Sequence, residues 1–558
     1  MTTTLSQTKT TAFSRRSFLR HAPVATAAAL TGAACVPSAV AASPAGHASV
    51  FNPRDHGAVA DGRTLDTVAI QMAIDACAAA GGGTVTLRGG VFLAGSILLK
   101  SNVTLNIEGG AKLLGSPRIG DYRATPFPAL SNIAWALIIA EKAKNIGITG
   151  AGELECNGGK FEGELLKNGK LHRTTPRPAV VRFIDSEHVR LDGFQLRDYP
   201  SFGIHLIGCR HVDIDHLTID CHAQSINDAI DIWDCEKVFI SNCSIFSGDD
   251  CIAIYSEHRP CTDITIVNCQ LSTLCQAVRV GPFSTKGLER IVVSNCIFRN
   301  VGHSGICLQM CQGGIMQDLL FSNIIMENVV APITLRLGGW ESDPQKDITQ
   351  APTMGDAGWE KGMLRNVQFQ NIRATVPAVS MQGTPYEAGW RNMPKLVGMK
   401  RSCIQLMGTP GTTIENVMFS DVHVTFPGGG TAEEAARRDI PELERQYPAS
   451  YMFGILPAYG LYARHVRGLS LHNVRFDLAA PDLRPALICD NVEDLELQNF
   501  RAAAHAEVEC LARLSKVRRV NIANSRPLSP VRDFLQLEQT PIGEVLMNGN
   551  DLRLVQTR

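Results

Sequence analysis

The sequence predicts an all-β protein wound as a parallel solenoid, and an internal repeat is the main reason. Short runs of apolar and β-branched residues recur about every 23 to 28 residues, each close to an Asn or Asp. Apolar residues alternate within the runs, and no segment keeps a helical period. Such strands are too short to be stable alone, so we expect each coil to stack on the next. The clearest runs are residues 189–194, 212–217, 238–243, 264–269 and 291–296, and looser copies follow at 319–324, 367–372, 417–422, 469–474 and 495–500.

Stacked coils place equivalent side chains in ladders. Four asparagines at one register position should stack amide on amide and satisfy turn backbone groups: Asn242, Asn268, Asn295 and Asn323. The residue after each of the first three is a cysteine, which gives a second ladder of Cys243, Cys269 and Cys296. A metal site is the functional alternative for these thiols. They lack the paired short spacing of zinc ligands, so the sequence favours a structural stack.

A helix is predicted ahead of the repeats, over residues 66–80. Asp66 is placed to cap its N-terminus, and the glycines at 81–83 end it. Its apolar face carries Ile70, Ile74 and Cys77. Such a capping helix would plug the open end of the solenoid, where exposed strand edges would otherwise recruit other chains.

Residues 1–42 are predicted to be a targeting segment outside the fold. Arg15 and Arg16 lie in a stretch that resembles a twin-arginine export signal, and an Ala-rich segment and a small-residue cleavage site follow. The alternatives are a chance arginine pair and a lipoprotein cleavage box at Cys35, where Gly32 replaces the usual leucine. We therefore expect the twin-arginine export machinery to deliver the protein to the periplasm or the medium.

Residues 43–558 are expected to form one β-helix domain. Two segments, 378–399 and 428–459, interrupt the later coils with Pro, Gly, Trp and charged residues. We interpret both as loop insertions on one face, which is where a solenoid usually contacts its substrate.

The composition excludes several classes of protein. With 45% hydrophobic and 19% charged residues, the chain is globular. A formal net charge of −1 without Lys or Arg runs argues against nucleic acid and membrane surfaces as partners. No later stretch is long and apolar enough to predict a membrane span. The 17 cysteines are spread along the chain, and we expect most to be reduced core residues.

Three acidic residues are expected to meet at one corner of the solenoid. Apolar alternation aligns residues 228–233, 250–255 and 276–281 in consecutive coils. Because buried unpaired carboxylates are costly, we expect the chain to bend there and present Asp228, Asp249 and Asp250 together to solvent. Crowded acids raise one another's pKa, so a protonated acid can stand beside an ionised base, as glycoside hydrolysis requires. A calcium site or a solvated acidic turn is the alternative.

A family resemblance rests on the run Gly248-Asp249-Asp250-Cys251 and on two N-terminal motifs, Asp55-His-Gly-Ala-Val-Ala-Asp-Gly62 and Gly81-Gly-Gly-Thr-Val85. With these motifs the chain resembles glycoside hydrolase family 28, the polygalacturonase family. The resemblance implies a single-stranded right-handed parallel β-helix of the pectin-lyase-like type that hydrolyses pectin. It also implies that Asp249 is the general acid, and that Asp228 and Asp250 hold and activate the attacking water with inversion. An inverting pair stands roughly 6.5 to 9.5 Å apart.

Three motifs of that family are altered here. Asn-Thr-Asp reads Ile226-Asn227-Asp228, Gly-His-Gly falls on Cys275-Gln276-Ala277, and Arg-Ile-Lys falls on Cys307-Leu308-Gln309. The histidine that tunes the acid and both cations that grip a galacturonate carboxylate are therefore missing. A rhamnogalacturonan, a decorated pectin or a rhamnoside is expected as substrate rather than plain homogalacturonan.

Residues around this corner are candidates for substrate binding. Arg279 is placed either to restore a carboxylate clamp or to pair with Asp231 on the same outward row. Two outward aromatic residues suit either stacking on sugar rings or covering an insertion loop. His303 either replaces the missing histidine or is a plain turn residue. The predicted set is Asp231, Trp233, Tyr255, Gln276, Arg279, His303 and Gln309.

The predicted function is hydrolysis of pectic polysaccharides or oligosaccharides without a cofactor or metal. A calcium-dependent β-helix polysaccharide lyase is one alternative, which the acid-rich corner fits less well. A carbohydrate-binding β-helix with a decayed site is the other.

Overall fold

A computed structural model describes residues 50–125, 134–161, 176–221, 227–339, 361–379, 401–445 and 448–556. The chain divides into two units, Met1–His47 and Ala48–Arg558, and the described residues belong to the second. The predicted targeting segment, Ile226 and nearly all of the insertion at 378–399 lie outside the described residues.

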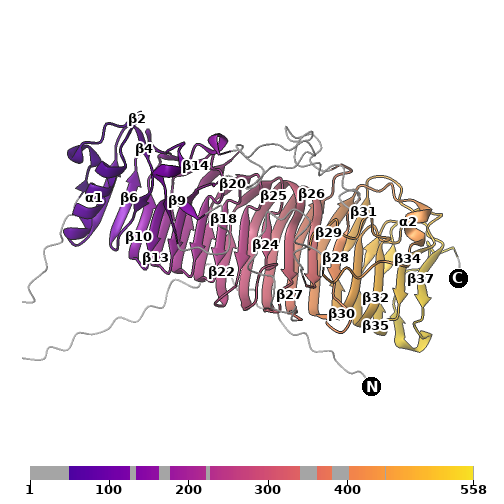
Figure 1. Ribbon diagram of the computed structural model, residues 1–558. Coiled ribbons are helices and arrows are strands. Elements are labelled where there is room, and N and C mark those ends of the chain that lie inside the picture. The colour runs from indigo at the N-terminus through magenta and orange to yellow at the C-terminus, as the bar shows by residue number, and fades with distance from the viewer. Residues whose placement is uncertain are drawn as a thin grey trace, which may run out of the picture. The chain divides into compact units, whose positions relative to one another are not determined.

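The second unit is the predicted right-handed parallel β-helix, and each coil contributes strands to three faces (Figure 1). The first face contains β5 (Ile97–Leu98), β9 (Trp135–Glu141), β12 (Ala179–Ile184), β15 (Ile204–Ile207), β18 (Ile230–Trp233), β21 (Ile252–Tyr255), β24 (Val278–Val280), β28 (Ile404–Met407), β34 (Cys510–Ser515) and β37 (Asp533–Glu538). The second contains β1 (Val50–Phe51), β3 (Gly83–Leu87), β6 (Val103–Ile107), β10 (Lys144–Thr149), β13 (Glu187–Asp192), β16 (Arg210–Asp215), β19 (Glu236–Ser241), β22 (Cys261–Val267), β27 (Met363–Thr375), β29 (Ile414–Phe426), β35 (Arg518–Ala523) and β38 (Val545–Asn548).

The third face contains β2 (Asp61–Leu65), β4 (Gly90–Ala94), β7 (Ala111–Gly115), β11 (Glu153–Glu155), β14 (Gln195–Arg197), β17 (Thr218–Asp220), β20 (Ser244–Ser247), β23 (Gln270–Thr273), β31 (Arg475–Leu478), β33 (Arg501–Ala502) and β36 (Arg526–Pro527). Among the described strands, β27 and β29 continue from the second face onto the third, and four further long strands bend from one face to the next: β25 (Gly287–Met310), β26 (Ile315–Leu337), β30 (Leu461–His472) and β32 (Leu487–Gln498). The short strand β8 (Arg123–Ala124) pairs antiparallel with β9.

The predicted register of the three central coils is confirmed. Ile230 pairs with Ile252, which pairs with Val278, and these three inward side chains are fully buried. Burying each of them contributes roughly 1.5 to 3 kcal/mol. The outward residue after Ile230 is Asp231, and its row continues through Ala253 to Arg279. Fixing the inward row thus fixes which polar side chains share the outer surface.

The predicted ladders are present. Asn268 Nδ2 donates to Asn242 Oδ1 at 3.3 Å, and Asn323 Nδ2 donates to Asn295 Oδ1 at 3.0 Å. These asparagines have φ between 54° and 57°, a left-handed conformation that asparagine tolerates well. The 16 cysteines of the described residues are free thiols and are buried, as the structural alternative predicts.

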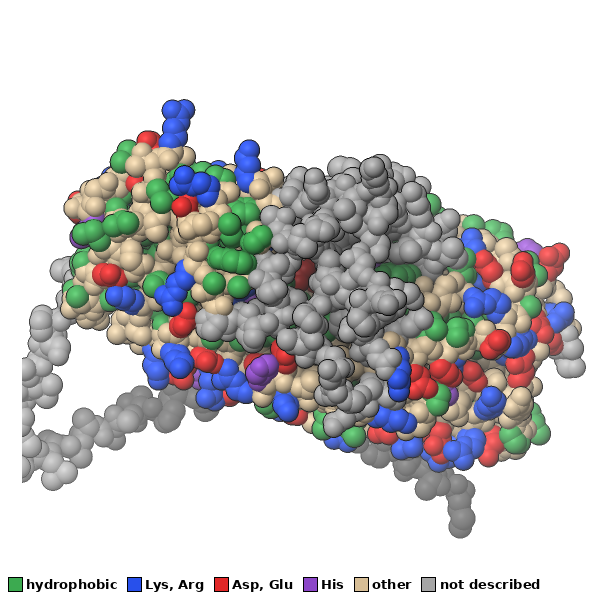
Figure 2. Space-filling model, in the orientation of Figure 1, with side chains coloured by type: hydrophobic (Ala, Val, Ile, Leu, Met, Phe, Trp, Pro, Cys, Tyr) green, Lys and Arg blue, Asp and Glu red, His purple; other side chains and the backbone are tan. Residues whose placement is uncertain are grey.

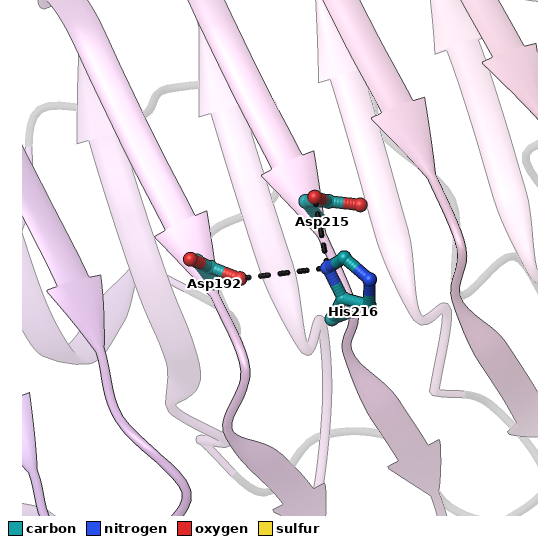
Figure 3. Close-up of side chains that lie close together, drawn as sticks. All are labelled: Asp192, Asp215 and His216. Carbon is teal, nitrogen blue, oxygen red and sulfur yellow. Dashed lines mark ion pairs between the residues drawn. The ribbon is translucent and has the colours of Figure 1, made fainter.

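His216 occupies the ladder position one coil before Asn242, and it forms a surface cluster with two acids (Figure 3). Its Nδ1 lies 2.8 Å from Asp215 Oδ2 and 3.8 Å from Asp192 Oδ1. Asp215 also accepts from Asn242 Nδ2 at 2.8 Å, so the cluster extends the ladder. We assign it a structural role.

The predicted N-terminal helix is α1 (Thr67–Ala79), and it packs against β1, β3 and β5. Ile70, Ile74 and Cys77 are fully buried, as expected for its apolar face. The role predicted for Asp66 is wrong, because its carboxylate does not accept a hydrogen bond from the helix. Instead it accepts from the backbone N–H groups of Val59 and Ala60 at 2.7 and 3.0 Å, and so ties down the preceding turn.

The described surface carries mixed charge. On the face shown in Figure 2, Lys and Arg side chains are interspersed with Asp and Glu and do not gather in a patch of one sign. This agrees with the near-zero formal net charge of the sequence. None of the described helices has both the length and the apolar character needed to cross a membrane.

Candidate active site

The acidic cluster lies where strands of the third face end and strands of the first face begin. Asp228 precedes β18, while Asp249 and Asp250 connect β20 to β21 in the next coil. The backbone N–H of Asp250 donates to Asp228 Oδ1 at 3.3 Å, which joins the two coils at this corner. The structure thus brings together the three predicted catalytic residues.

A buried asparagine that is absent from the predicted site residues, Asn227, positions the cluster. Asn227 is fully buried, and its Oδ1 accepts from the Gly248 N–H at 2.9 Å. Ser247 Oγ donates to the Asp249 carbonyl oxygen at 2.6 Å, and Thr273 Oγ1 donates to the same oxygen. The backbone of Asp249 is therefore fixed while its carboxylate stays partly exposed. Asn227 stands where the Asn-Thr-Asp motif has its threonine, and this polar residue directly before Asp228 was the signal that could have found it.

Asp250 is buried, with 1% of its surface exposed, and this corrects the prediction that all three acids face solvent. Its charge is compensated by Arg279, whose Nη1 lies 3.2 Å from Asp250 Oδ2. The Gln276 N–H donates to Asp250 Oδ1 at 3.2 Å. An ion pair and a backbone hydrogen bond offset much of the free energy that is needed to bury a carboxylate. The prediction considered only an unpaired buried carboxylate.

The same contact rules against one of the two alternatives for Arg279, a pairing with Asp231. Asp231 lies two coils from Arg279, with Ala253 between them, whereas Asp250 lies at the adjacent corner. Asp231 is fully buried, and neither of its carboxylate oxygens has a hydrogen-bond partner among the described residues.

Burial makes these acids hard to ionise. It raises the pKa of Asp228 well above the ordinary value, and the charges of Asp231, Asp249 and Asp250 raise it further. The pKa of Asp231 is raised for the same main reason, with Asp250 adding to the effect. Burial also raises the pKa of Asp250 to about 6, although Arg279 offsets part of the shift. The cluster therefore retains protons at a pH where ordinary carboxyls have lost them.

His303 lies beside the cluster, at the place where the altered Gly-His-Gly motif lacks its histidine. Its Nδ1 is 3.8 Å from Cys275 Sγ, and its backbone N–H donates to the Cys275 carbonyl oxygen at 2.9 Å. Cys275 Sγ also donates to Gln276 Oε1 at 2.6 Å. One oxygen each of Asp249 and Asp250 and the Cys275 sulfur lie within 4.8 Å of one another. The thiol thus links the histidine to the acids, and Cys275 is a site residue that the sequence pattern does not predict.

The two outward aromatic residues are buried rather than exposed. Trp233 and Tyr255 retain 5% and 3% of their surface, and their ring centroids lie 4.8 Å apart. Phe202 and Phe283 pack against them. Of the two alternatives for these rings, the structure favours packing over an exposed sugar platform.

Gln309 is fully buried, and its Nε2 donates to the Pro448 carbonyl oxygen at 2.6 Å. The side chain that falls at the lysine position of the Arg-Ile-Lys motif is therefore held by the insertion at 428–459.

The model of the family described as Glycosyl hydrolases family 28 matches residues 81–385, which include the acidic cluster and the coils around it. The chain belongs to glycosyl hydrolases family 28. This is a family of O-glycosyl hydrolases, and membership confirms the resemblance drawn from the motifs.

Curated relatives of the family 28 chain are similar over part of their length. An exo-poly-alpha-D-galacturonosidase from Dickeya chrysanthemi is 24% identical over 434 residues, which are 68% of this chain and 71% of the relative. A probable polygalacturonase from Vitis vinifera is 27% identical over 49% of this chain, and the match spans 60% of the grape protein.

Two solved structures share the fold. The family 28 exopolygalacturonase of Yersinia enterocolitica aligns with a TM-score of 0.57 and 19% identity over 80% of this chain and 78% of its own. The exopolygalacturonase of Thermotoga maritima aligns with a TM-score of 0.55 and 19% identity over 77% and 92% of the two chains. At this identity the likeness supports the parallel β-helix fold alone.

Proposed function

We propose that the protein hydrolyses glycosidic bonds in a pectic polysaccharide or oligosaccharide. Asp249 is the general acid that protonates the leaving oxygen, and Asp228 and Asp250 hold and activate the attacking water. The observation that carries this proposal is the meeting of three carboxyls at one corner of two consecutive coils, where the Asp250 N–H donates to Asp228 Oδ1 at 3.3 Å and one oxygen each of Asp249 and Asp250 lie within 4.8 Å of each other. Such a cluster can keep an acid protonated beside an ionised base.

The contacts of each acid suit its proposed role. The carboxylate of Asp249 is partly exposed above a backbone fixed by Ser247 and Thr273, as a proton donor to substrate needs to be. Both oxygens of Asp250 accept hydrogen bonds, one from Gln276 and one from Arg279. An acid held in this way orients a water better than it attacks carbon, which favours the inverting use of the cluster.

The altered motifs guide the choice of substrate. No cation stands at either position of the Arg-Ile-Lys motif, and Arg279 is already paired with Asp250. We therefore propose a rhamnogalacturonan, a decorated pectin or a rhamnoside rather than plain homogalacturonan. His303 is proposed to replace the missing histidine through Cys275, acting on the acids as a positioning residue.

Product analysis on pectic fractions tests this function. The protein should release new reducing ends without the ultraviolet absorbance of an unsaturated sugar. Unsaturated products would mean a lyase, and binding without products would mean a carbohydrate-binding β-helix.

We further propose export by the twin-arginine route, with residues 1–42 as signal and 43–558 as the mature domain. Changing both Arg15 and Arg16 to Lys should leave full-length protein in the cytoplasm, because that machinery reads the arginine pair. Fractionation followed by immunoblotting measures this. Unchanged recovery in the periplasm or medium would contradict the route.

A further inference from the structure

The insertion at 428–459, here called the strap, bears on which bonds the protein can reach. It leaves the solenoid between β29 and β30 and contains the short helix α2 (Ala432–Ala436). Thr431 Oγ1 accepts from the Glu434 N–H at 3.2 Å, and the Glu434 carboxylate accepts from the Thr431 N–H at 3.1 Å. This capping box gives the strap a defined start. Its described parts are residues 428–445 and 448–459.

Outward side chains of the first face hold the strap by its backbone. Arg513 on β34 donates to the Ala435 carbonyl oxygen at 2.9 Å. Arg464 on β30 donates to the Pro441 carbonyl oxygen at 3.0 Å. Because β34 pairs with β32 and β32 with β30, the strap runs backward along the sheet, toward the acids.

The same pattern continues on the coils nearer the acidic cluster. Arg336 on β26 donates to the Leu443 carbonyl oxygen at 2.7 Å, and Gln309 on β25 donates to that of Pro448 at 2.6 Å. These side chains point outward, yet the strap buries them. Their exposed fractions are 0% for Gln309, 2% for Arg336, 3% for Arg464 and 2% for Arg513.

The C-terminal part of the strap lies beside the acidic cluster. Gln405 Nε2 donates to the Ser450 carbonyl oxygen at 2.9 Å. The Tyr451 ring then meets the edge of the His303 ring, with centroids 5.5 Å apart and planes at 83°. The Tyr451 ring therefore forms an aromatic wall over His303 of β25, beside the residues that contact the acids.

The wall lies close to the proposed point of cleavage. Asp250 enters β21, which pairs with β24, and β24 pairs with β25. Two coil steps of about 4.8 Å place the wall roughly 10 Å from Asp250. A sugar unit in a chain is about as long as one coil step, so at most two units fit between the acids and the wall.

We propose that the strap blocks the path of a bound polysaccharide on the C-terminal side of the acids, so that the protein acts at chain ends and releases one or two sugar units at a time. The inference rests on the proposed hydrolase function and on a substrate lying along the solenoid axis. Internal cleavage would need several units on both sides of the acids, and the strap occupies that space on one side.

Early products of the full-length mature protein test this. On a soluble pectic polymer that it cleaves, the first products should be mono- or disaccharides, and viscosity should fall little per reducing end formed. Oligosaccharides of mixed length at the earliest times would overturn the strap proposal and leave the hydrolase function intact. An absence of any product would instead overturn the hydrolase function.

Two variants test whether the strap is what limits the first products to one or two sugar units. Replacing residues 438–452 with a short Gly-Ser linker should give early products longer than two units. Tyr451→Ala is the milder change and should add products one unit longer, since it removes only the ring at the wall. If both variants are folded by circular dichroism and release the same short products as the unchanged protein, the strap is not the barrier.

Discussion

Asp249→Asn is expected to lower kcat on a pectic substrate by about 10² to 10⁴, the usual worth of a positioned general acid. An amide cannot donate the proton that the leaving oxygen needs, so the loss should be largest for a poor leaving group. The fold should survive, because Ser247 and Thr273 hold the backbone carbonyl of Asp249 and not its side chain. Steady-state kinetics with circular dichroism measures both effects.

Asp213→Asn is the matched control, since Asp213 is exposed on β16 of the second face and takes the same chemical change. It should keep full activity. A folded Asp249→Asn variant that is as active as this control on a substrate with a poor leaving group would show that Asp249 is not the acid.

Arg279→Ala is expected to shift the pH dependence of kcat/KM. Arg279 lowers the pKa of Asp250, which is nevertheless about 6, so Asp250 ionises on the acidic limb of the profile. Without the guanidinium, the pKa of Asp250 rises and the carboxyl stays protonated to higher pH. A charge-assisted hydrogen bond worth about 1.5 to 3 kcal/mol corresponds to a shift of the acidic limb by roughly one to two pH units upward.

The variant should also lower the melting temperature, because it leaves a buried carboxyl without its counter-ion. Arg279→Lys keeps the charge and should move the limb less. Arg190→Ala, which removes an exposed arginine paired with Asp192, should change neither quantity. A lower melting temperature with an unmoved acidic limb would mean that Arg279 only supports the scaffold.

The fold could be predicted from the sequence because the same alternation of buried apolar and outward residues recurs in each coil. Alternating apolar residues gave the register of Ile230, Ile252 and Val278, and that register places Asp228 and Asp250 at one corner. The asparagine ladder could be predicted because turn positions with positive φ favour Asn. Periodicity therefore determined the residues that face inward and those that share a row.

Contacts between rows and insertions could not be predicted in this way. Periodicity places Arg279 on the row of Asp231, but a corner residue outside the strand, Asp250, is its nearer partner. The burial of Gln309 depends on Pro448, which is 139 residues further along the chain. Asp66 failed as a predicted helix cap because two backbone N–H groups of the preceding turn compete for its carboxylate.

The configuration of the first product tests the central claim most directly. An inverting pair of carboxyl groups stands roughly 6.5 to 9.5 Å apart to leave room for the attacking water, and one oxygen each of Asp249 and Asp250 lie within 4.8 Å of each other. We propose that Asp228, which accepts from the Asp250 N–H, helps to hold this water. Proton NMR of the anomeric signal in the first minutes of a reaction, before mutarotation, reads this outcome. We predict a product of inverted configuration, and a product of retained configuration would contradict the assignment of Asp228 and Asp250 to water activation.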